Sequence, residues 1–336
     1  MKSNKVTIND ISTALGISSV SVSRALAGHS GVSEEVKNRI LEKAKEMGYI
    51  RNKRLDQLNI LVLHHKPFVE DNSYFSNMIQ GVEKSLQNNN IDYSLEFIDS
   101  QAQERLSLPN KLSKGFVFDG VLLIGRFHPE YAGFIQRKLN NFVSFTGYSP
   151  AYNVDCILFN FNNAGYKLCE YLIQKGHTAI GFLGSTHIFR NKERLLGLTT
   201  ALEDYQLTYN SDYCIDYDTE YPSKILELIH KQNMPSALIC ENDIRAIELI
   251  KLLHVHHINV PEDVSVVGSG NTDISSICTP ALTTMDFNLE YSSDAAVSTL
   301  IKRILTPNKP FETILVLSDL VERESVKCLK ENPIPF

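Results

Sequence analysis

Residues 6–50 read VTINDISTALGISSVSVSRALAGHSGVSEEVKNRILEKAKEMGYI, and capping residues divide this stretch into three predicted helices. Thr7 can cap the first helix, in which apolar residues recur at helical spacing, and Gly16 can end it in the left-handed conformation. Ser18 and Ser33 can cap the second and third helices. Three short helices with a glycine turn between the first two are typical of a helix-turn-helix that binds DNA.

The second predicted helix carries the side chains expected to contact DNA. Val22, Ala25 and Leu26 form its apolar stripe, so the other positions include its outward face. The outward residues are short apart from Arg24, which lets the helix backbone lie deep in the major groove. Val20 can contact a thymine methyl group, and Arg24 can reach a guanine or a phosphate. The predicted DNA contacts of this unit are Thr7, Ser18, Ser19, Val20, Ser21, Ser23 and Arg24.

The third predicted helix completes a small apolar core. It carries two glutamates in its first turn and ends at Gly48, and its expected buried residues are Val36, Ile40, Leu41, Ala44 and Met47. The alternative interpretation of the whole unit is a generic three-helix core with a small, serine-rich surface.

Charge is distributed unevenly along the 336 residues. Residues 1–54 contain ten basic and five acidic side chains, an excess of five positive charges. Because the whole chain carries −6, the remaining residues carry −11. A basic head on an acidic body concentrates attraction for a polyanion at one end of the molecule.

Other features of the sequence narrow the class of protein. No apolar run approaches the ~20 residues of a membrane span, and the first residues lack the apolar core of a signal peptide. The six cysteines are far apart and form no C-x-x-C pair, which is typical of a reducing compartment. We therefore expect a cytoplasmic protein without membrane contact. No catalytic motif is found, a metal cluster of His254, His256 and His257 is disfavoured, and we expect no catalytic residue, metal or cofactor.

From residue 59 onward, short apolar runs rich in β-branched residues alternate with amphipathic stretches. Repetition of strand, helix and strand predicts doubly wound parallel sheets with helices on both faces. About ten strands are too many for one small sheet, so we expect two lobes. The apolar runs predict strands over 59–64, 93–98, 119–125, 142–146, 155–159, 178–184, 236–240, 264–268 and 312–317.

The residues that follow these strands suggest a ligand. Sheets of this kind bind ligands at the carboxyl ends of their strands. Aromatic rings can cover the apolar faces of a sugar while amides and guanidinium groups bind its hydroxyls, so a polyhydroxylated ligand is indicated. The residues found there are Ser73, Tyr74, Phe75, Gly147, Tyr148, Arg190, Arg194, Tyr217, Asn242, Asp243, Ser269, Gly270, Asn271 and Phe287.

The order of residues in the head resembles that of the lactose/galactose repressor family of bacterial regulators. The matching pieces are Thr7, Asp10, Ile11, Ala14, Gly16, Ser18, Val22-Ser23-Arg24, Leu26, Val32-Ser33, Ile40 and Gly48-Tyr49. Further matches continue along the body: Gly81-Val82-Glu83, Gly165, Gly176-His177, Ile180-Gly181-Phe182, Arg194 with Gly197, Asn242-Asp243, VPEDVSVVG (260–268) and PALTT (280–284).

The resemblance implies a fold and roles for individual residues. It implies a ligand domain of two lobes, related to periplasmic sugar-binding proteins, and it places Ser19 and Val20 at the positions that set DNA specificity. It also implies that the segment over 50–58 forms a hinge on DNA, with Asn52 and Lys53 at its start and Leu55 or Leu58 as a minor-groove wedge. The segment is shorter than the family pattern, so a solvated linker is the alternative. Implied effector contacts are Tyr74, Phe75, Met78, Arg194, Tyr217, Asn242, Asn271 and Phe287.

Two positions depart from the family pattern. Gly270 stands where an acid often follows the VSVVG strand, and Gly147 stands where a larger polar residue is common. The effector is therefore not expected to be simply that of the best-known members.

The predicted organisation is a helix-turn-helix head (1–50), a linker (51–58) and an effector-binding and dimerisation domain (59–336). Lobe 1 is expected at about 59–160 and 290–319, and lobe 2 at about 161–289 and 320–336. The predicted function is sequence-specific regulation of transcription, expected to be repression. A homodimer or tetramer would bind a pseudo-palindromic operator, and a sugar-like effector between the lobes would modulate its affinity. The alternatives are a solute-binding module and a sugar-modifying enzyme.

Overall fold

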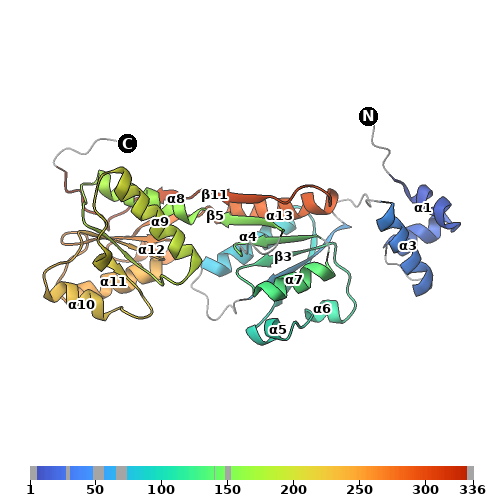
Figure 1. Ribbon diagram of the computed structural model, residues 1–336, viewed down its shortest axis with the longest axis horizontal. Helices are drawn as coiled ribbons and strands as arrows, with labels where there is room; N and C mark the ends of the chain where they lie inside the picture. The colour runs from blue at the N-terminus through green and yellow to red at the C-terminus, as the bar shows by residue number, and fades with distance from the viewer. Residues whose placement is uncertain are drawn as a thin grey trace. The chain divides into compact units, whose positions relative to one another are not determined.

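The computed structural model describes residues 6–27, 31–47, 57–65, 74–139, 141–147 and 153–330, without the side chains of Ala27, Lys45 and Tyr74 (Figure 1). The predicted hinge residues Asn52, Lys53 and Leu55, and the predicted effector contact Ser73, lie outside the described residues. The chain divides into two compact units. Unit 1 comprises Met1–Pro67, Val82–Cys156 and Asp294–Glu312, and unit 2 comprises Phe68–Gly81, Ile157–Ser293 and Thr313–Phe336.

The head consists of the three predicted helices, α1 (Ile8–Leu15), α2 (Ser19–Ala27) and α3 (Glu34–Glu46). Thr7 and Asp10 form a capping box at α1: the Thr7 hydroxyl accepts from the Asp10 N–H (3.3 Å), and the Asp10 carboxylate accepts from the Thr7 N–H (2.7 Å). Gly16 ends the helix at φ 65°, a conformation that favours glycine. Local sequence signals therefore determine where α1 begins and ends.

The core of the head is built from Ile11, Val22, Ala25, Ile40 and Ala44, each at most 5% exposed. The prediction that Leu41 is buried was wrong, since its side chain is 43% exposed. Ile40 and Ala44 are four residues apart and therefore share one face of α3, whereas Leu41 is turned about 100° away from that face.

The first sheet has the strand order β11-β5-β4-β3-β1-β2. Strand β1 lies between β2 and β3 and is parallel to both, and β4 is parallel to β3. The apolar runs of β1, β3 and β4 are almost entirely buried, as expected of strands covered on both faces. The strands are β1 (Asn59–His64), β2 (Asp92–Phe97), β3 (Gly120–Ile124), β4 (Phe142–Phe145), β5 (Asp155–Phe159) and β11 (Thr313–Val316).

Helices follow the strands of this part of the chain. Tyr131 and Ile135 of α7 pack into the apolar core beside Leu61, Val121 and Leu123 of the strands. The helices are α4 (Tyr74–Asn88), α5 (Ser100–Glu104), α6 (Asn110–Ser113), α7 (Pro129–Lys138) and α13 (Leu289–Leu305).

The second sheet has the order β12-β10-β9-β8-β6-β7, and its described pairs are parallel except for one. The exception is the antiparallel pair of β10 with β12, which the prediction of parallel sheets did not include. The strands are β6 (Ile180–Leu183), β7 (Cys214–Ile215), β8 (Ala237–Cys240), β9 (Ser265–Ser269), β10 (Thr283–Asp286) and β12 (Asp319–Val321).

Strands β7, β10 and β12 were not predicted. They contain two to four residues, and β10 (TTMD) and β12 (DLV) lack a run of β-branched apolar residues. The helices of this part are α8 (Phe161–Gln174), α9 (Phe189–Asp204), α10 (Ser223–His230), α11 (Asp243–Val255) and α12 (Asp273–Ile277). With two parallel α/β sheets and a three-helix head, the predicted fold class is confirmed. In the described part of the chain, none of the helices has the length and apolar character needed to span a membrane.

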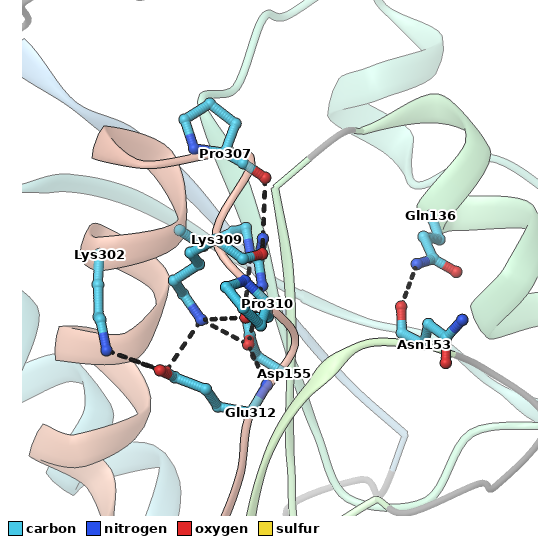
Figure 2. A network of polar contacts seen from close by, with 9 residues as sticks. Gln136, Asn153, Asp155, Lys302, Pro307, Lys309, Pro310 and Glu312 are labelled. Atoms are coloured by element: carbon cyan, nitrogen blue, oxygen red, sulfur yellow. Dashed lines mark hydrogen bonds and ion pairs between the residues drawn. The ribbon is translucent and has the colours of Figure 1, made fainter. Parts of the chain in front are cut away.

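A buried ion network joins the start of β5 to the segment between α13 and β11 (Figure 2). The fully buried Asp155 carboxylate accepts from Arg303 Nε (2.6 Å), Arg303 Nη2 (3.0 Å) and Lys309 Nζ (2.6 Å). It also accepts from the backbone N–H of Glu312 (2.9 Å). Arg303 further donates to the carbonyls of Pro307, Lys309 and Pro310. Nothing in the sequence pattern pointed to this network.

Candidate DNA-binding and effector-binding sites

The outward face of α2 presents the side chains predicted to contact DNA. Ser19, Ser23 and Arg24 are exposed, and Val20 is 61% exposed. The Val20 side chain is therefore accessible to a partner. The expectation that Val22, Ala25 and Leu26 face inward agrees with their packing in the core of the head.

Three other predicted DNA contacts have structural bonds within the head. The Thr7 hydroxyl takes part in the α1 capping box. The Ser18 oxygen accepts from the Ser21 N–H (3.1 Å), and the two hydroxyls lie 2.8 Å apart. These residues hold the amino ends of α1 and α2, and any contact they make with phosphate would come in addition to that role.

Leu58 cannot act as the minor-groove wedge that the sequence left open. Its side chain is fully buried next to β1, and its carbonyl accepts from the Asp92 N–H (3.1 Å). The residue therefore begins the core of the body. The wedge interpretation now depends on Leu55 alone, which lies outside the described residues.

Arg194 lies at the centre of the candidate effector site in unit 2. It comes from α9, which follows β6, and only 3% of it is exposed. Its guanidinium carbon lies 4.6 Å from the centre of the Phe161 ring and 5.7 Å from that of Phe287. These two rings meet edge to face at 5.4 Å. The cation is thus placed against two aromatic rings that follow β5 and β10.

A buried polar chain begins at Arg194. Arg194 Nη1 donates to Asn191 Oδ1 (2.7 Å), and Asn191 Nδ2 donates to the Ser185 carbonyl (3.1 Å) and to the Glu241 carboxylate. Glu241 directly follows β8 and also accepts from the Ser185 N–H (3.1 Å). Its other oxygen lies 3.6 Å from Arg245 Nε. The carboxyl ends of β6 and β8 are therefore connected through side chains.

Asp243 connects the ends of β8, β9 and β10. Its carboxylate accepts from the Thr272 N–H and hydroxyl (2.8 Å each) and from the Thr284 hydroxyl (2.5 Å). A Cβ atom on Gly268 would lie 2.4 Å from this carboxylate, so only glycine fits at that position of β9. The packing of Asp243 thus explains the first glycine of the run Gly268-Ser269-Gly270-Asn271.

Tyr217 follows the short strand β7, but other side chains cover its ring. The guanidinium of Arg245 lies 3.5 Å from the ring centre, and Tyr221 stacks on Tyr217 at 4.9 Å. The Tyr217 hydroxyl donates to Glu248 (2.9 Å) and accepts from Arg245 (2.7 Å). Burial and the bond to Glu248 raise the pKa of Tyr217. With its ring covered and its hydroxyl engaged, Tyr217 is better suited to hold Arg245 than to stack on a ligand.

Two further predicted contacts are engaged at the strand ends. Asn271, at φ 45°, donates to Asp286 (2.9 Å) and accepts from Arg323 (2.7 Å). Asn242 caps α11 by accepting from the Arg245 N–H (2.9 Å). These hydrogen bonds give both side chains a structural role in the site, in addition to any contact with a ligand.

Phe75 and Met78 lie on α4 in unit 2 and are 7% and 3% exposed. Tyr74 is the first residue of this helix, and its side chain is not described. These three positions follow β1 along the chain, as predicted.

Gly147 of unit 1 has a steric explanation. A Cβ atom here would lie 2.2 Å from the Gly125 carbonyl oxygen and 3.0 Å from Ser144 Oγ. The larger polar residue common in the resembled family could not be accommodated by this backbone. The close approach of the backbone segments after β3 and β4 therefore explains why glycine replaces the residue common in the family at this position.

Sequence reasoning missed three residues of the unit 2 site. Phe161, Asn191 and Glu241 were not selected, although Phe161 and Glu241 closely follow predicted strands. That position is a signal that could have found both of them. Asn191 lies within a helix, and nothing in its spacing distinguishes it from a surface amide.

The structure defines a class of protein: a helix-turn-helix head joined to a body of two parallel α/β sheets with polar and aromatic residues at their strand ends. Two family models match the chain. Bacterial regulatory proteins of the lacI family match residues 7–52, and a periplasmic binding protein-like domain matches residues 169–326. The chain thus carries the DNA-binding domain of the lacI family, and it is a DNA-binding transcriptional regulator that responds to an effector.

Known proteins resemble the chain over most of its length. A probable HTH-type transcriptional repressor, ExuR of Bacillus subtilis, is 26% identical over 96% of this chain and 99% of its own. The regulator CelR in complex with cellobiose shares the fold with a TM-score of 0.68 at 21% identity, covering 96% of this chain and 100% of that chain. The lac repressor dimer bound to operator and the anti-inducer ONPF has a TM-score of 0.67 at 18% identity with the same coverage.

Proposed function

We propose that this regulator represses transcription by placing the exposed face of α2 in the major groove of a pseudo-palindromic operator, as a homodimer. The observation that carries the proposal is the exposed row of Ser19, Val20, Ser23 and Arg24 beside a buried Val22. Small side chains allow close approach, and one valine and one arginine supply apolar and polar contacts to base edges. Two identical heads match the two half-sites of an operator.

Substitution of Arg24 tests the DNA half of the proposal. Operator sequences would first be enriched from random duplexes with the full chain. Arg24→Ala should then lower the ratio of specific to non-specific binding by roughly tenfold or more, as expected for a lost base contact worth ~1–3 kcal/mol. Lys43→Ala is the matched control, because that cation on α3 pairs with Glu46 (2.9 Å). Equal ratios for the two variants would refute the assignment.

For the effector, we propose a small polyhydroxylated molecule that binds at the carboxyl ends of the unit 2 strands, against Arg194, Phe161 and Phe287. Support comes from a buried guanidinium placed on two aromatic rings, with the amide of Asn191 beside it. Aromatic faces suit the C–H surfaces of sugars, and fixed donors suit their hydroxyls. The cellobiose held by CelR makes this sugar a first probe, and ribose, bound by a LacI family regulator of similar fold from Enterococcus faecium, is a second.

Thermal shift measurements with cellobiose and ribose test this assignment, because a ligand at free concentration L that binds the native state stabilises it by RT ln(1 + L/Kd) and so raises Tm. Arg194→Ala should weaken binding of the active probe by roughly tenfold, the effect of losing a charged hydrogen bond worth ~1.5 kcal/mol. Arg190→Ala is the control, since Arg190 is exposed on the same helix. If Arg194→Ala bound the probe as tightly as Arg190→Ala, Arg194 would be removed from the site.

A further inference from the structure

We propose that Glu241 is a positioning residue that fixes the guanidinium of Arg194 through the amide of Asn191. The inference rests on the proposed function only in taking Arg194 as an effector contact. The three side chains are 5%, 3% and 0% exposed for Glu241, Arg194 and Asn191, so their bonds are shielded from water. They belong to the end of β8 and to α9, two elements far apart in the sequence.

The orientation of the Asn191 amide follows from its acceptors. Its Nδ2 group faces the Ser185 carbonyl (3.1 Å) and the Glu241 carboxylate, and an ionised carboxylate can only accept. The amide oxygen must therefore point the other way, where it accepts from Arg194 Nη1 (2.7 Å). A buried amide held by two acceptors on one side cannot reverse without leaving donors unpaired.

The carboxylate of Glu241 has donors on both sides. One oxygen accepts from the Ser185 N–H and from Asn191, and the other lies 3.6 Å from Arg245 Nε and 3.5 Å from Asn242 Nδ2. Glutamine would keep the first set of bonds but turn an NH2 group towards two donors. A carboxylate is thus the side chain that satisfies both sides, and its charge lies near Arg245.

The consequence for the site is a fixed direction for the donors of Arg194. The guanidinium is held by Asn191 at one nitrogen and lies against the rings of Phe161 and Phe287. A preorganised cation of this kind favours ligands whose oxygens fit its fixed orientation, which selects among polyhydroxylated effectors by the geometry of their hydroxyls. Glu241 therefore sets specificity without touching the ligand.

A double-mutant cycle at positions 191 and 241 tests the proposal in the full chain without effector. Asn191→Asp places a second carboxylate against Glu241 and should lower Tm by about 5 °C or more, as expected for a buried repulsion in a unit of this size. Glu241→Gln alone should have a smaller effect, because it keeps the oxygen that accepts from Asn191 and disturbs only the longer contacts with Asn242 (3.5 Å) and Arg245 (3.6 Å). In the combined variant the glutamine amide can donate to the carboxylate introduced at position 191, so about half or more of the loss should be recovered.

The second readout is the side-chain ¹⁵N NMR signal of Arg194, assigned with Arg194→Lys. In the native chain and in Glu241→Gln, hindered rotation should keep its Nη protons distinct. In Glu241→Ala, where the Asn191 amide loses the carboxylate that orients it, they should average. A role of Glu241 in stability alone would lower Tm in Glu241→Ala without changing this signal.

Equal losses of Tm for Asn191→Asp with and without Glu241→Gln, or an Arg194 signal unchanged by Glu241→Ala, would overturn the proposal. Because both readouts need no effector, this failure is distinct from that of the effector site. The latter would show as cellobiose or ribose binding that Arg194→Ala leaves intact.

Discussion

Among the polar contacts of unit 1, the ion network around Asp155 should contribute most to the free energy of unfolding (Figure 2). The substitution Asp155→Asn tests this prediction. The carboxylate accepts four hydrogen bonds, from two nitrogens of Arg303, from Lys309 Nζ and from the Glu312 N–H. Asparagine keeps one acceptor oxygen and turns an NH2 group towards a cation. If two charged bonds are lost at ~1.5 kcal/mol each, the free energy of unfolding falls by about 3 kcal/mol.

This magnitude agrees with the ~3–5 kcal/mol expected when one partner of a buried ion pair is removed. Arg303 keeps three carbonyl acceptors, which holds the loss near the lower end of that range. Glu312→Gln is the matched control: its carboxylate pairs with Lys302 and Lys309, but the side chain is 38% exposed, so water screens these pairs and the loss should be much smaller.

The assay is urea unfolding of the full chain, monitored by circular dichroism. A thermal scan of the same variants gives Tm. A loss of about 3 kcal/mol corresponds to roughly 6–12 °C in Tm for a unit of this size. If Asp155→Asn cost no more than Glu312→Gln, the carboxylate would not be holding the two cations, and the reasoning would be refuted.

The pH dependence of the difference in unfolding free energy between the native chain and Asp155→Asn gives a second check. Burial alone would raise the pKa of Asp155, but hydrogen bonds from Arg303 and Lys309 hold it below its usual 3.8. A depressed carboxyl pKa contributes stability that is complete above the unfolded value and is lost as pH falls through the folded one. The difference in unfolding free energy between the native chain and Asp155→Asn should therefore be constant from pH 5 to 8 and should decrease below about pH 4.

Three further outcomes are expected. Burial lowers the pKa of His177 below 6.5, and its bond to the Lys327 carbonyl opposes only part of this effect. The unfolded chain then binds the proton at higher pH than the native chain, so the free energy of unfolding should fall as pH drops from 7 towards 5. His177→Gln should make the urea midpoint less dependent on pH over this range. Equal pH dependence in the two chains would exclude His177 as the cause. Gly147→Ala should cost ~2 kcal/mol or more of unfolding free energy, because its Cβ would lie 2.2 Å from the Gly125 carbonyl oxygen; an unchanged Tm would show that this backbone can yield. Thr7→Ala should cost ~1 kcal/mol and speed amide exchange in α1, and unaltered exchange there would argue against the capping box.

The spacing of capping and apolar residues along the chain was enough to predict the three helices of the head and the parallel α/β class of the body. Thr7 and Gly16 mark the ends of α1 because caps act within one turn of a helix, and apolar runs marked most of the long strands because strands covered on both faces must be apolar. The same local logic placed Arg194 after the predicted strand that became β6, whereas β10, which precedes Phe287, was not predicted. Leu41 was assigned to the wrong face, since neighbouring apolar residues at helical spacing do not say which one points inward.

Only the tertiary structure decided which of these residues meet and what they do. Asp155 and Arg303 are 148 residues apart, and Asn191 and Glu241 are 50 apart, so no pattern within a turn or a strand brings them together. The covered ring of Tyr217 and the buried side chain of Leu58 likewise depend on packing between elements that are separate in the sequence. Caps and faces follow from bonds between near neighbours, whereas a site at the ends of several strands exists only once those strands have found their order in the sheet.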